Sequence, residues 1–458
     1  MDIAARVYDI MISFIRNNDL FLTEDDEMSM YCNQCEQTAK HIACTVKGVC
    51  GKDEDIQSLQ LLLTYALKGI AAYSYHARIL GKRSEDIDAF MHEALFKTLT
   101  NVDFSIEDHW NLVLRAGTIN LKAMEILDAG NIEHFGVPVP TKVKSGTMKG
   151  PGIVVTGHDL LDLEELLKQT AGTGINIYTH GEMLPAHGYP NLKKHPHLIG
   201  NWGTAWQRQR TEFAEFGGPI LATTNCVLIP TEKYRDRLFT TGITAISGVK
   251  HIMDRKDFSP IIDMAKDIGD LPERNGKELE TGYHHKTVLK LAPKIVEAVK
   301  AGKIRHFFLI GGCDGATPGR NYYTELAEKV PDDCVILTLA CGKYRFNERD
   351  FGSIDGIPRL LDMGQCNNAY SAIQLAVELA KAFNCGVNDL PLSIVLSWFE
   401  QKAVAIFLTL LALGVKNVRI GPSLPAFISP NNLKTLQDRF NVMPLADPDA
   451  DLKSMLKE

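Results

Sequence analysis

Four cysteines close to the start of the chain have a spacing that suits a metal centre. The pattern C-x2-C-x8-C-x5-C places four thiols within 19 residues, at Cys32, Cys35, Cys44 and Cys50. Such a compact set can form disulfides, bind structural zinc, or hold a cubane iron–sulfur cluster. Disulfides conflict with the reducing compartment that we expect for this chain. The spacing favours the iron–sulfur cluster, but it does not by itself separate iron from zinc.

A second set of residues that can bind metal is scattered along the rest of the chain. Six of seven short apolar runs lead directly to such a residue, namely to His158, Glu182, Cys226, Cys313, Cys341 and Glu400. Cys366, in the string GQCNN, follows a helix-like or loop segment and could complete the set. In open parallel sheets, ligand sites collect at the carboxyl ends of strands. We therefore expect these seven side chains to meet in one crevice.

The mixture of residue types in this second set indicates a polynuclear centre. Four thiols, one imidazole and two carboxylates exceed the four ligands that zinc takes. Soft sulfur ligands beside harder nitrogen and oxygen ligands suit an iron centre with both sulfide and oxygen species. Taken singly, a cysteine after a strand is more often a small apolar core residue, and a lone histidine is more often structural. Their coincidence at strand ends favours the metal interpretation.

Other cysteines and histidines lack this placement. We expect Cys334 and Cys385 to be ordinary free thiols. His180 lies two residues before Glu182 and could support the site or be an ordinary surface or core residue. We expect structural roles for two further histidine pairs, His195/His197 and His284/His285.

The remaining sequence predicts the elements that position these residues. Residues 1–29 form an extension with one amphipathic pattern, and three further apolar stripes predict a three-helix bundle over 30–136. From about residue 140, short apolar runs alternate with helix candidates, which is typical of parallel α/β sheets. We therefore expect a multidomain α/β fold, with Rossmann-like, mostly parallel domains over 137–272 and 273–458.

Composition and charge limit the class of protein. The chain of 458 residues has 49 Lys and Arg against 56 Asp and Glu, a net charge of −7, so we expect no nucleic-acid or anionic-membrane partner. No apolar stretch of ~18 residues predicts a membrane-spanning helix. Asp2 stands where a secretory signal has basic residues, and ten cysteines are too few for a disulfide scaffold of this length. We therefore expect a cytoplasmic protein.

The chain resembles the hybrid-cluster proteins, also called prismane proteins, whose members are identified as hydroxylamine reductases. The resemblance lies in strings that run in consistent order from residue 31 to about 427: YCNQCEQTA with GVCGK, TGHDL, YTHGEMLPA, GPILATTNC, GGCDG, CGKYRFN, DMGQCNN, WFEQKAVA and GPSLPAF. Many members have two helical bundles before the α/β domains. Only about 90 residues separate Cys50 from the first expected strand, so this chain resembles a short class without the second bundle.

The resemblance implies two metal clusters. The four N-terminal cysteines would bind a [4Fe–4S] cluster. A hybrid [4Fe–2S–2O] cluster would take seven ligands: His158, Glu182, Cys226, Cys313, Cys341, Cys366 and Glu400. The match to GGCDG makes Cys313 the position of a persulfide, and the resemblance implies catalytic roles for Glu182, Glu400 and His158.

The activity that the resemblance implies is the two-electron reduction of hydroxylamine to ammonia and water. An external, unidentified electron donor protein would supply the electrons. Related functions stay open, including nitric oxide reduction or S-nitrosylation in nitrosative-stress defence, and a redox carrier or sensor without hydroxylamine turnover. A nickel carbon monoxide dehydrogenase is a further hypothesis, against which the two carboxylate ligands argue.

Overall fold

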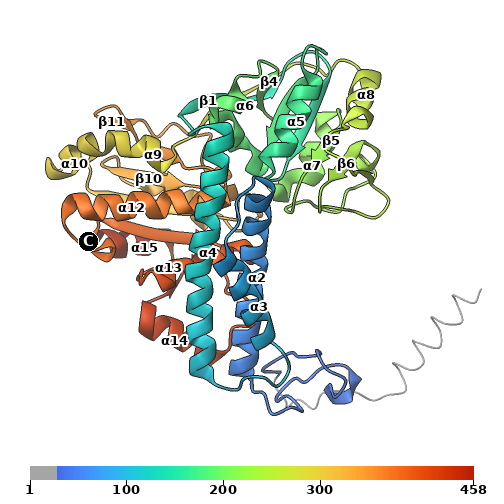
Figure 1. Ribbon diagram of the computed structural model, residues 1–458. Helices are drawn as coiled ribbons and strands as arrows, with labels where there is room; N and C mark the ends of the chain where they lie inside the picture. Colours follow the sequence, from blue (N-terminus) through green and yellow to red (C-terminus); the bar gives the residue numbers. More distant parts are fainter. Residues whose placement is uncertain (1–27) are drawn as a thin grey trace, which may run out of the picture.

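The computed structural model describes residues 28–458, which form a multidomain α/β protein with mostly parallel sheets (Figure 1). Two long helices run from a small cysteine-bearing module at one end of the molecule towards two β-sheets. The amphipathic pattern expected within residues 1–29 lies outside the described residues, which include only the last two positions of that extension.

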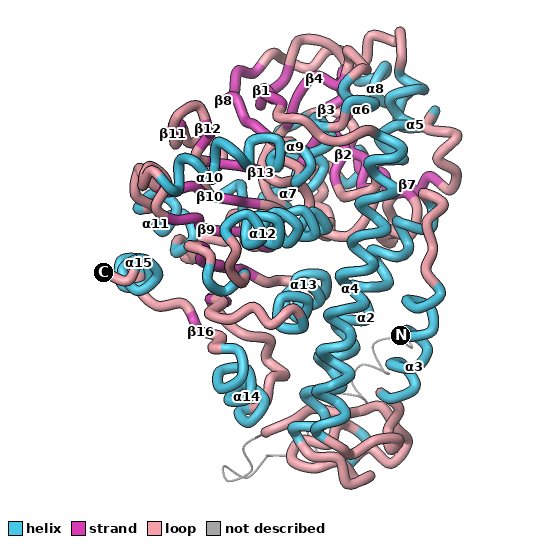
Figure 2. Tube along the Cα trace, turned by 60° about the vertical axis from the view of Figure 1, so that its left-hand side comes forward, coloured by secondary structure: helices cyan, strands magenta, loops and turns pink. Residues whose placement is uncertain are grey.

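The two long helices are α2 (Glu54–Ile79) and α4 (Ile106–Phe135), which lie side by side (Figure 2). The shorter α3 (Glu85–Lys97) packs against both. Asp53 caps the start of α2, where its side chain accepts a hydrogen bond from the N–H of Ile56 at 2.9 Å. The N-terminus of α2 is therefore fixed only three residues after the last N-terminal cysteine.

A helix from the C-terminal half, α13 (Gln401–Ala412), packs against both long helices. The contact is so close at Gly117 that a Cβ there would lie 2.6 Å from the carbonyl carbon of Leu408. Thr409 Oγ1 donates a hydrogen bond to the Gly117 carbonyl at 2.9 Å. This packing fixes the start of α13, directly after Glu400.

The first sheet has eight strands in the spatial order β7-β6-β5-β2-β3-β4-β1-β8. Their bounds are β1 (Thr141–Thr147), β2 (Gly152–Thr156), β3 (Asn176–His180), β4 (Leu198–Asn201), β5 (Ile220–Ala222), β6 (Leu238–Thr241), β7 (Lys250–Ile252) and β8 (Arg274–Thr281). Neighbours are parallel except β1 and β8, which are antiparallel. Its helices are α5 (Leu160–Thr170), α6 (Pro190–Lys193), α7 (Gln209–Phe216) and α8 (Ser259–Ile268).

The second sheet has six parallel strands in the order β13-β10-β9-β14-β15-β16. Their bounds are β9 (His306–Gly312), β10 (Cys334–Thr338), β13 (Leu360–Asp362), β14 (Leu392–Ser397), β15 (Arg419–Gly421) and β16 (Met443–Pro444). A small antiparallel pair, β11 (Ser353–Ile354) and β12 (Ile357–Pro358), lies outside it. The remaining helices are α9 (His285–Val288), α10 (Ala292–Lys300), α11 (Tyr322–Lys329), α12 (Ala369–Phe383), α14 (Pro430–Phe440) and α15 (Pro448–Leu456).

The central strands explain why short apolar runs mark this fold. β2 and β10 are buried along their whole length, because helices cover both faces of a parallel sheet. Such strands are apolar throughout instead of alternating. The polar residues that matter for function therefore come after each strand ends.

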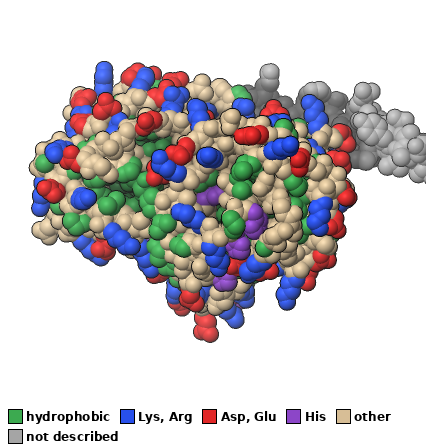
Figure 3. Space-filling model, turned by 90° about the horizontal axis from the view of Figure 1, so that it is seen from above, with side chains coloured by type: hydrophobic (Ala, Val, Ile, Leu, Met, Phe, Trp, Pro, Cys, Tyr) green, Lys and Arg blue, Asp and Glu red, His purple; other side chains and the backbone are tan. Residues whose placement is uncertain are grey.

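The outer surface carries both signs of charge. Seen from above, acidic and basic side chains are interspersed, and a small group of histidines is exposed near the centre of that face (Figure 3). Within residues 28–458, no helix combines the length and apolar character that a membrane crossing requires.

Candidate functional site

All seven residues of the scattered set follow the carboxyl ends of parallel strands. The first sheet supplies three, from the neighbouring strands β5, β2 and β3: Cys226, His158 and Glu182. The second sheet supplies four, from the neighbouring strands β13, β10, β9 and β14: Cys366, Cys341, Cys313 and Glu400. Cys366 thus also follows a strand, β13, which the sequence analysis did not find. The site lies between the two sheets, where the edges formed by the carboxyl ends of their strands face each other.

Three of the seven residues meet where these edges face each other. Donor atoms of His158, Glu182 and Cys366 lie within 4.8 Å of one another. His158 Nε2 is 3.7 Å from Glu182 Oε2, and that oxygen accepts a hydrogen bond from the Cys366 N–H at 2.8 Å. The other carboxylate oxygen, Glu182 Oε1, is buried without a hydrogen-bond partner. Because buried polar atoms are normally paired, this oxygen marks a position for a further group.

The other four residues lie close enough to act on one another electrostatically. Burial raises the pKa of the Cys226 thiol well above its ordinary value, and negative charge on Glu400 and Cys313 raises it further. Burial also raises the pKa of Cys341, to which Glu182 and Cys226 contribute. Residues from both sheets therefore influence one another's charge, which burial leaves poorly screened.

The backbone after several strands turns through the left-handed region. A Cβ at Gly157, directly before His158, would lie 2.8 Å from the Thr224 nitrogen, so only glycine fits there. Cys226 and Ala340 adopt positive φ values of 65° and 60° although they are not glycine. Such conformations cost roughly 1–3 kcal/mol each and cluster at functional sites.

Two side chains from the first sheet's part of the chain hold the loop at Cys313. Trp206 Nε1 and Gln207 Nε2 donate hydrogen bonds to the Cys313 carbonyl at 3.2 and 2.9 Å. The Trp206 ring stacks on Phe399, with centroids 4.1 Å apart. These contacts bridge the two sheets beside the site, and no spacing pattern predicts them.

Lys402 places a buried cation among these anionic groups. Its Nζ lies 3.1 Å from His158 Nε2, 3.1 Å from Asn225 Oδ1 and 3.8 Å from Glu400 Oε1. Burial opposes the charged form, but negative charge on Cys366 and Glu400 outweighs it and raises the Lys402 pKa. The sequence left the direction of this side chain open, and the structure shows that it points into the site.

The donor set fits a polynuclear metal cluster. Burial raises the pKa of Cys366 to about 11, so its thiolate needs positive charge nearby. Lys402 contacts this set at Glu400 and His158, and the charge of Lys343 also reaches Glu182, so two lysines face four thiols and two carboxylates. Seven donors also exceed the coordination of a single zinc ion. Several metal ions would balance this charge, and one of them would bind the unpaired Glu182 oxygen.

The N-terminal cysteines form a separate module at the far end of α2. Cys32 and Cys44 pair as an antiparallel bridge, with N–H···O distances of 3.1 and 2.8 Å. Backbone N–H groups of Ala39 and Val49 donate to the Cys44 sulfur and lower the pKa of its thiol. No three of the four sulfurs, all in the described part, lie within 4.8 Å of one another.

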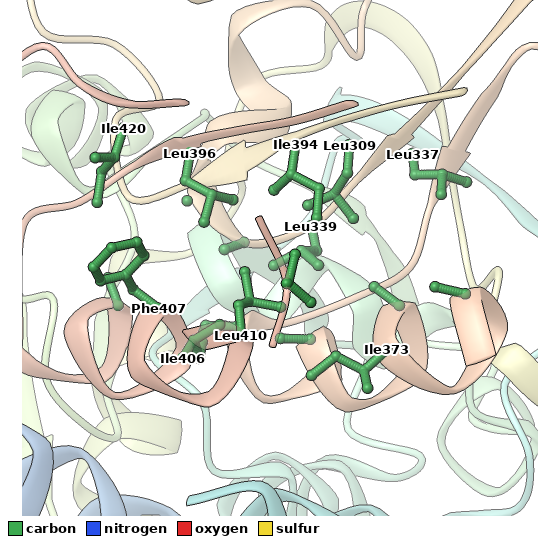
Figure 4. Close-up of a pocket in the computed structure, with 18 of the residues that line it drawn as sticks. Leu309, Leu337, Leu339, Ile373, Ile394, Leu396, Ile406, Phe407, Leu410 and Ile420 are labelled. Carbon is green, nitrogen blue, oxygen red and sulfur yellow. The ribbon is translucent and has the colours of Figure 1, made fainter. Parts of the chain in front are cut away.

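Two cavities reach the scattered set from different sides. A cavity of about 150 Å³ touches Cys313 and Cys366 and is lined almost entirely by apolar side chains of the second sheet, α12 and α13 (Figure 4). An apolar lining of this kind favours small uncharged molecules. A second cavity, of about 20 Å³, is more polar and touches His158 and Lys402. It has room for about one water-sized molecule.

The other cysteines and histidines from the sequence analysis lie outside this set. His180 is buried in β3, with Nε2 3.0 Å from Glu212 Oε2 and Nδ1 3.1 Å from Thr156 Oγ1, so it is a core residue. Cys334 is buried at the start of β10, at the opposite end of the strand from Cys341. His284 pairs with buried Asp128 at 2.9 Å, a contact between α4 and the segment before α9.

The fold and these two cysteine-rich sites define a class of α/β protein built around metal clusters. The family model described as the Prismane/CO dehydrogenase family matches residues 30–113 and 105–453. The chain therefore belongs to this family.

Several relatives of known name cover most of the chain. A hydroxylamine reductase of Moorella thermoacetica is 66% identical over 93% of this chain and all of its own length. A hydroxylamine reductase of Methanothermobacter thermautotrophicus is 50% identical over the same shares. A hydroxylamine reductase of Geobacter sulfurreducens is 47% identical over 94% of this chain and all of its own length. The alignment spans 549 positions, more than the length of this chain. That relative therefore has additional residues, as expected if this chain belongs to a short class.

Solved structures of lower identity show the same fold. Carbon monoxide dehydrogenase IV from Carboxydothermus hydrogenoformans gives a TM-score of 0.75 at 14% identity, covering 99% of this chain and 96% of that one. A nickel-free carbon monoxide dehydrogenase from Thermococcus sp. AM4 gives 0.75 at 16% identity, covering 94% and 90%.

Proposed function

We propose that this protein is a hydroxylamine reductase, an oxidoreductase that converts hydroxylamine, two electrons and two protons to ammonia and water. The observation that carries this proposal is the meeting of His158, Glu182 and Cys366, from both sheets, within 4.8 Å of one another. Relatives with 50 to 66% identity over most of this chain, named hydroxylamine reductase, support the same activity. The substrate is thus a small nitrogenous molecule.

We assign the cofactors to the two residue sets. The N-terminal cysteines would hold a [4Fe–4S] cluster, and the scattered set would hold the hybrid [4Fe–2S–2O] cluster, with Cys313 as the persulfide position. When bound, the hybrid cluster supplies electrons and an open metal position for the nitrogen or oxygen of the substrate. The side of the site with His158, Glu182 and Glu400 offers the harder ligands, so we place substrate binding there.

The chain's own residues prepare this side of the site. The Cys366 N–H and the buried charge of Lys402 hold the Glu182 and Glu400 carboxylates in place. Thr224 Oγ1 contacts His158 Nδ1 at 2.7 Å, which orients the imidazole so that Nε2 faces the set. Glu182, Cys366 and Lys402 are buried, which keeps bulk water from these three groups.

The finer organisation follows the same proposal. Residues 30–136 would be a three-helix bundle that carries the N-terminal cluster, and 137–272 and 273–458 would be Rossmann-like domains, although β8 (Arg274–Thr281) pairs into the first sheet.

An external protein would donate electrons in the cytoplasm. The electron donor would reach the cysteine module, which several exposed apolar residues surround, among them Tyr31, Ile42, Val46 and Val49.

The test is a Glu182→Gln variant in protein purified without oxygen. It should lose hydroxylamine turnover and change the spectrum of the hybrid cluster, while the spectrum of the N-terminal cluster stays the same. Glu215→Gln, at an exposed position on α7, is the matched control and should behave as wild type. Full turnover and unchanged spectra in Glu182→Gln would reject the assignment of this site.

A further inference from the structure

A fully buried ion pair joins the two turns that carry Cys341 and Cys366. Lys343, in the turn after β10, and Asp362, the last residue of β13, both have side chains that are 0% exposed. Lys343 Nζ donates hydrogen bonds to Asp362 Oδ1 at 2.5 Å and to the Gly364 carbonyl at 2.8 Å. Lys343 follows Cys341 by two residues, and Gly364 precedes Cys366 by two. The proposed function does not use this pair.

The backbones of both turns are tied to the same groups. The Gly364 N–H donates to Asp362 Oδ1 at 3.0 Å, and the Gly364 carbonyl also accepts the Ala340 N–H at 3.0 Å. Ala340 lies directly before Cys341 and has a φ of 60°, a strained conformation that persists only where its surroundings fix it. The ion pair and these hydrogen bonds fix both turns at the positions where the two cysteines begin.

Stability alone does not explain an ion pair of this kind. Moving two charges out of water is costly, and their attraction offsets this cost only when the remaining polar atoms are also hydrogen-bonded. The second carboxylate oxygen of Asp362, Oδ2, is buried without a hydrogen-bond partner among the described residues. The pair is therefore not arranged for the greatest stability. It does fix the distance between the two turns, because a lysine bonded to two acceptors in the other turn prevents either turn from shifting alone.

We propose that Lys343 and Asp362 are positioning residues that hold Cys341 and Cys366 at a fixed spacing for one metal cluster before the cluster binds. This inference rests on the proposed hybrid cluster. Residues that orient metal ligands typically change metal affinity by a factor of roughly 10–100. Loss of the pair should therefore weaken the retention of iron at this site by a factor in that range.

The first test removes both charges together, as Lys343→Met with Asp362→Asn, in the fully loaded protein. The new side chains are similar in size to the original ones, and no unpaired buried charge is left behind. The net charge beside the site is unchanged, so an effect reports the position of the turns. We expect a chelator to remove iron from the hybrid cluster roughly 10–100-fold faster than in the wild type, and the spectrum of that cluster to change. The N-terminal cluster should lose iron at the wild-type rate.

The matched control removes a second buried ion pair of the same sheet, Arg419 with Asp451. Arg419 Nε lies 2.9 Å from Asp451 Oδ1, the side chains are 6% and 7% exposed, and the pair joins β15 to α15, neither of which carries a residue of the set. Arg419→Met with Asp451→Asn should leave iron release from both clusters as in the wild type. Wild-type release in the Lys343 double variant, or equally accelerated release in both double variants, would overturn the inference.

A second measurement needs no variant and covers the case in which the Lys343 double variant does not fold. Hydrogen exchange of single amides in iron-free wild-type protein reports whether the two turns are ordered without metal. We expect the amides of Ala340 and Gly364 to exchange as slowly as those of β9, because the ion pair holds both turns. Rapid exchange of these two amides beside a protected β9 would show that metal orders the turns and that the pair does not. A wild-type protein that binds no second iron centre would instead reject the proposed function.

Discussion

A single added methyl group at Gly117 tests whether α4 and α13 position the site. Without this contact, Gly→Ala inside a helix should stabilise by about 1 kcal/mol, because alanine is the better helix former. The structure predicts the opposite sign, since the new Cβ would lie 2.6 Å from the Leu408 carbonyl carbon. Normal carbon contacts are near 3.5–4.0 Å, so the helices must separate by about 1 Å. Forced expansion of a packed core typically costs about 1–3 kcal/mol.

The separation should also reach the chemistry, because α13 begins directly after Glu400. A misplacement of about 1 Å can reduce a catalysed rate roughly 100-fold. The assay measures thermal unfolding, iron content and hydroxylamine turnover of Gly117→Ala beside Ala129→Val, a larger substitution at an exposed position of α4. We expect a lower unfolding temperature and reduced turnover for Gly117→Ala only. A raised unfolding temperature with full turnover would refute the reasoning.

Two further outcomes concern other parts of the chain. Cys35→Ser should abolish the N-terminal cluster signal and the turnover that the donor protein drives, while iron at the second site stays. The reason is that the two residue sets share no contact. Equal loss of iron from both sites would contradict this prediction. Burial lowers the pKa of His187 from 6.5 to about 4, so the unfolded chain binds more protons between these values. Stability should therefore be complete above pH 6.5 and fall by up to about 3 kcal/mol towards pH 4. His187→Gln should weaken this pH dependence in thermal unfolding, and an unchanged profile would show that other groups cause it.

The sequence predicted the central strands well because burial on both faces makes them apolar throughout. The apolar run that leads to His158 coincides with the fully buried β2, and the run that leads to Glu400 coincides with the partly buried β14. The strands that were missed are short or exposed. β13 has three residues, and the antiparallel edge strand β8 is polar and mostly exposed along its length, so neither has a hydrophobic pattern to detect.

The sequence predicted that residues able to bind metal follow the strands. It did not predict which other side chains contact them. The rule that ligand sites collect at strand ends needs only a residue and its preceding strand. Trp206, Gln207 and Lys402 act across the boundary between sheets, and their positions depend on how the sheets face each other.

The division of the seven residues between two sheets has a physical consequence for assembly. Three donors come from the first sheet and four from the second, so neither sheet alone offers a complete set. Bringing the sets together without metal concentrates thiols and carboxylates in a dry volume, which opposes docking of the two edges. Lys402 and the hydrogen bonds from Trp206 and Gln207 offset part of that cost. Metal binding offsets the rest, because a ligand that binds only the docked arrangement stabilises it by mass action. The residues that we propose as cluster ligands would therefore also join the two halves of the protein.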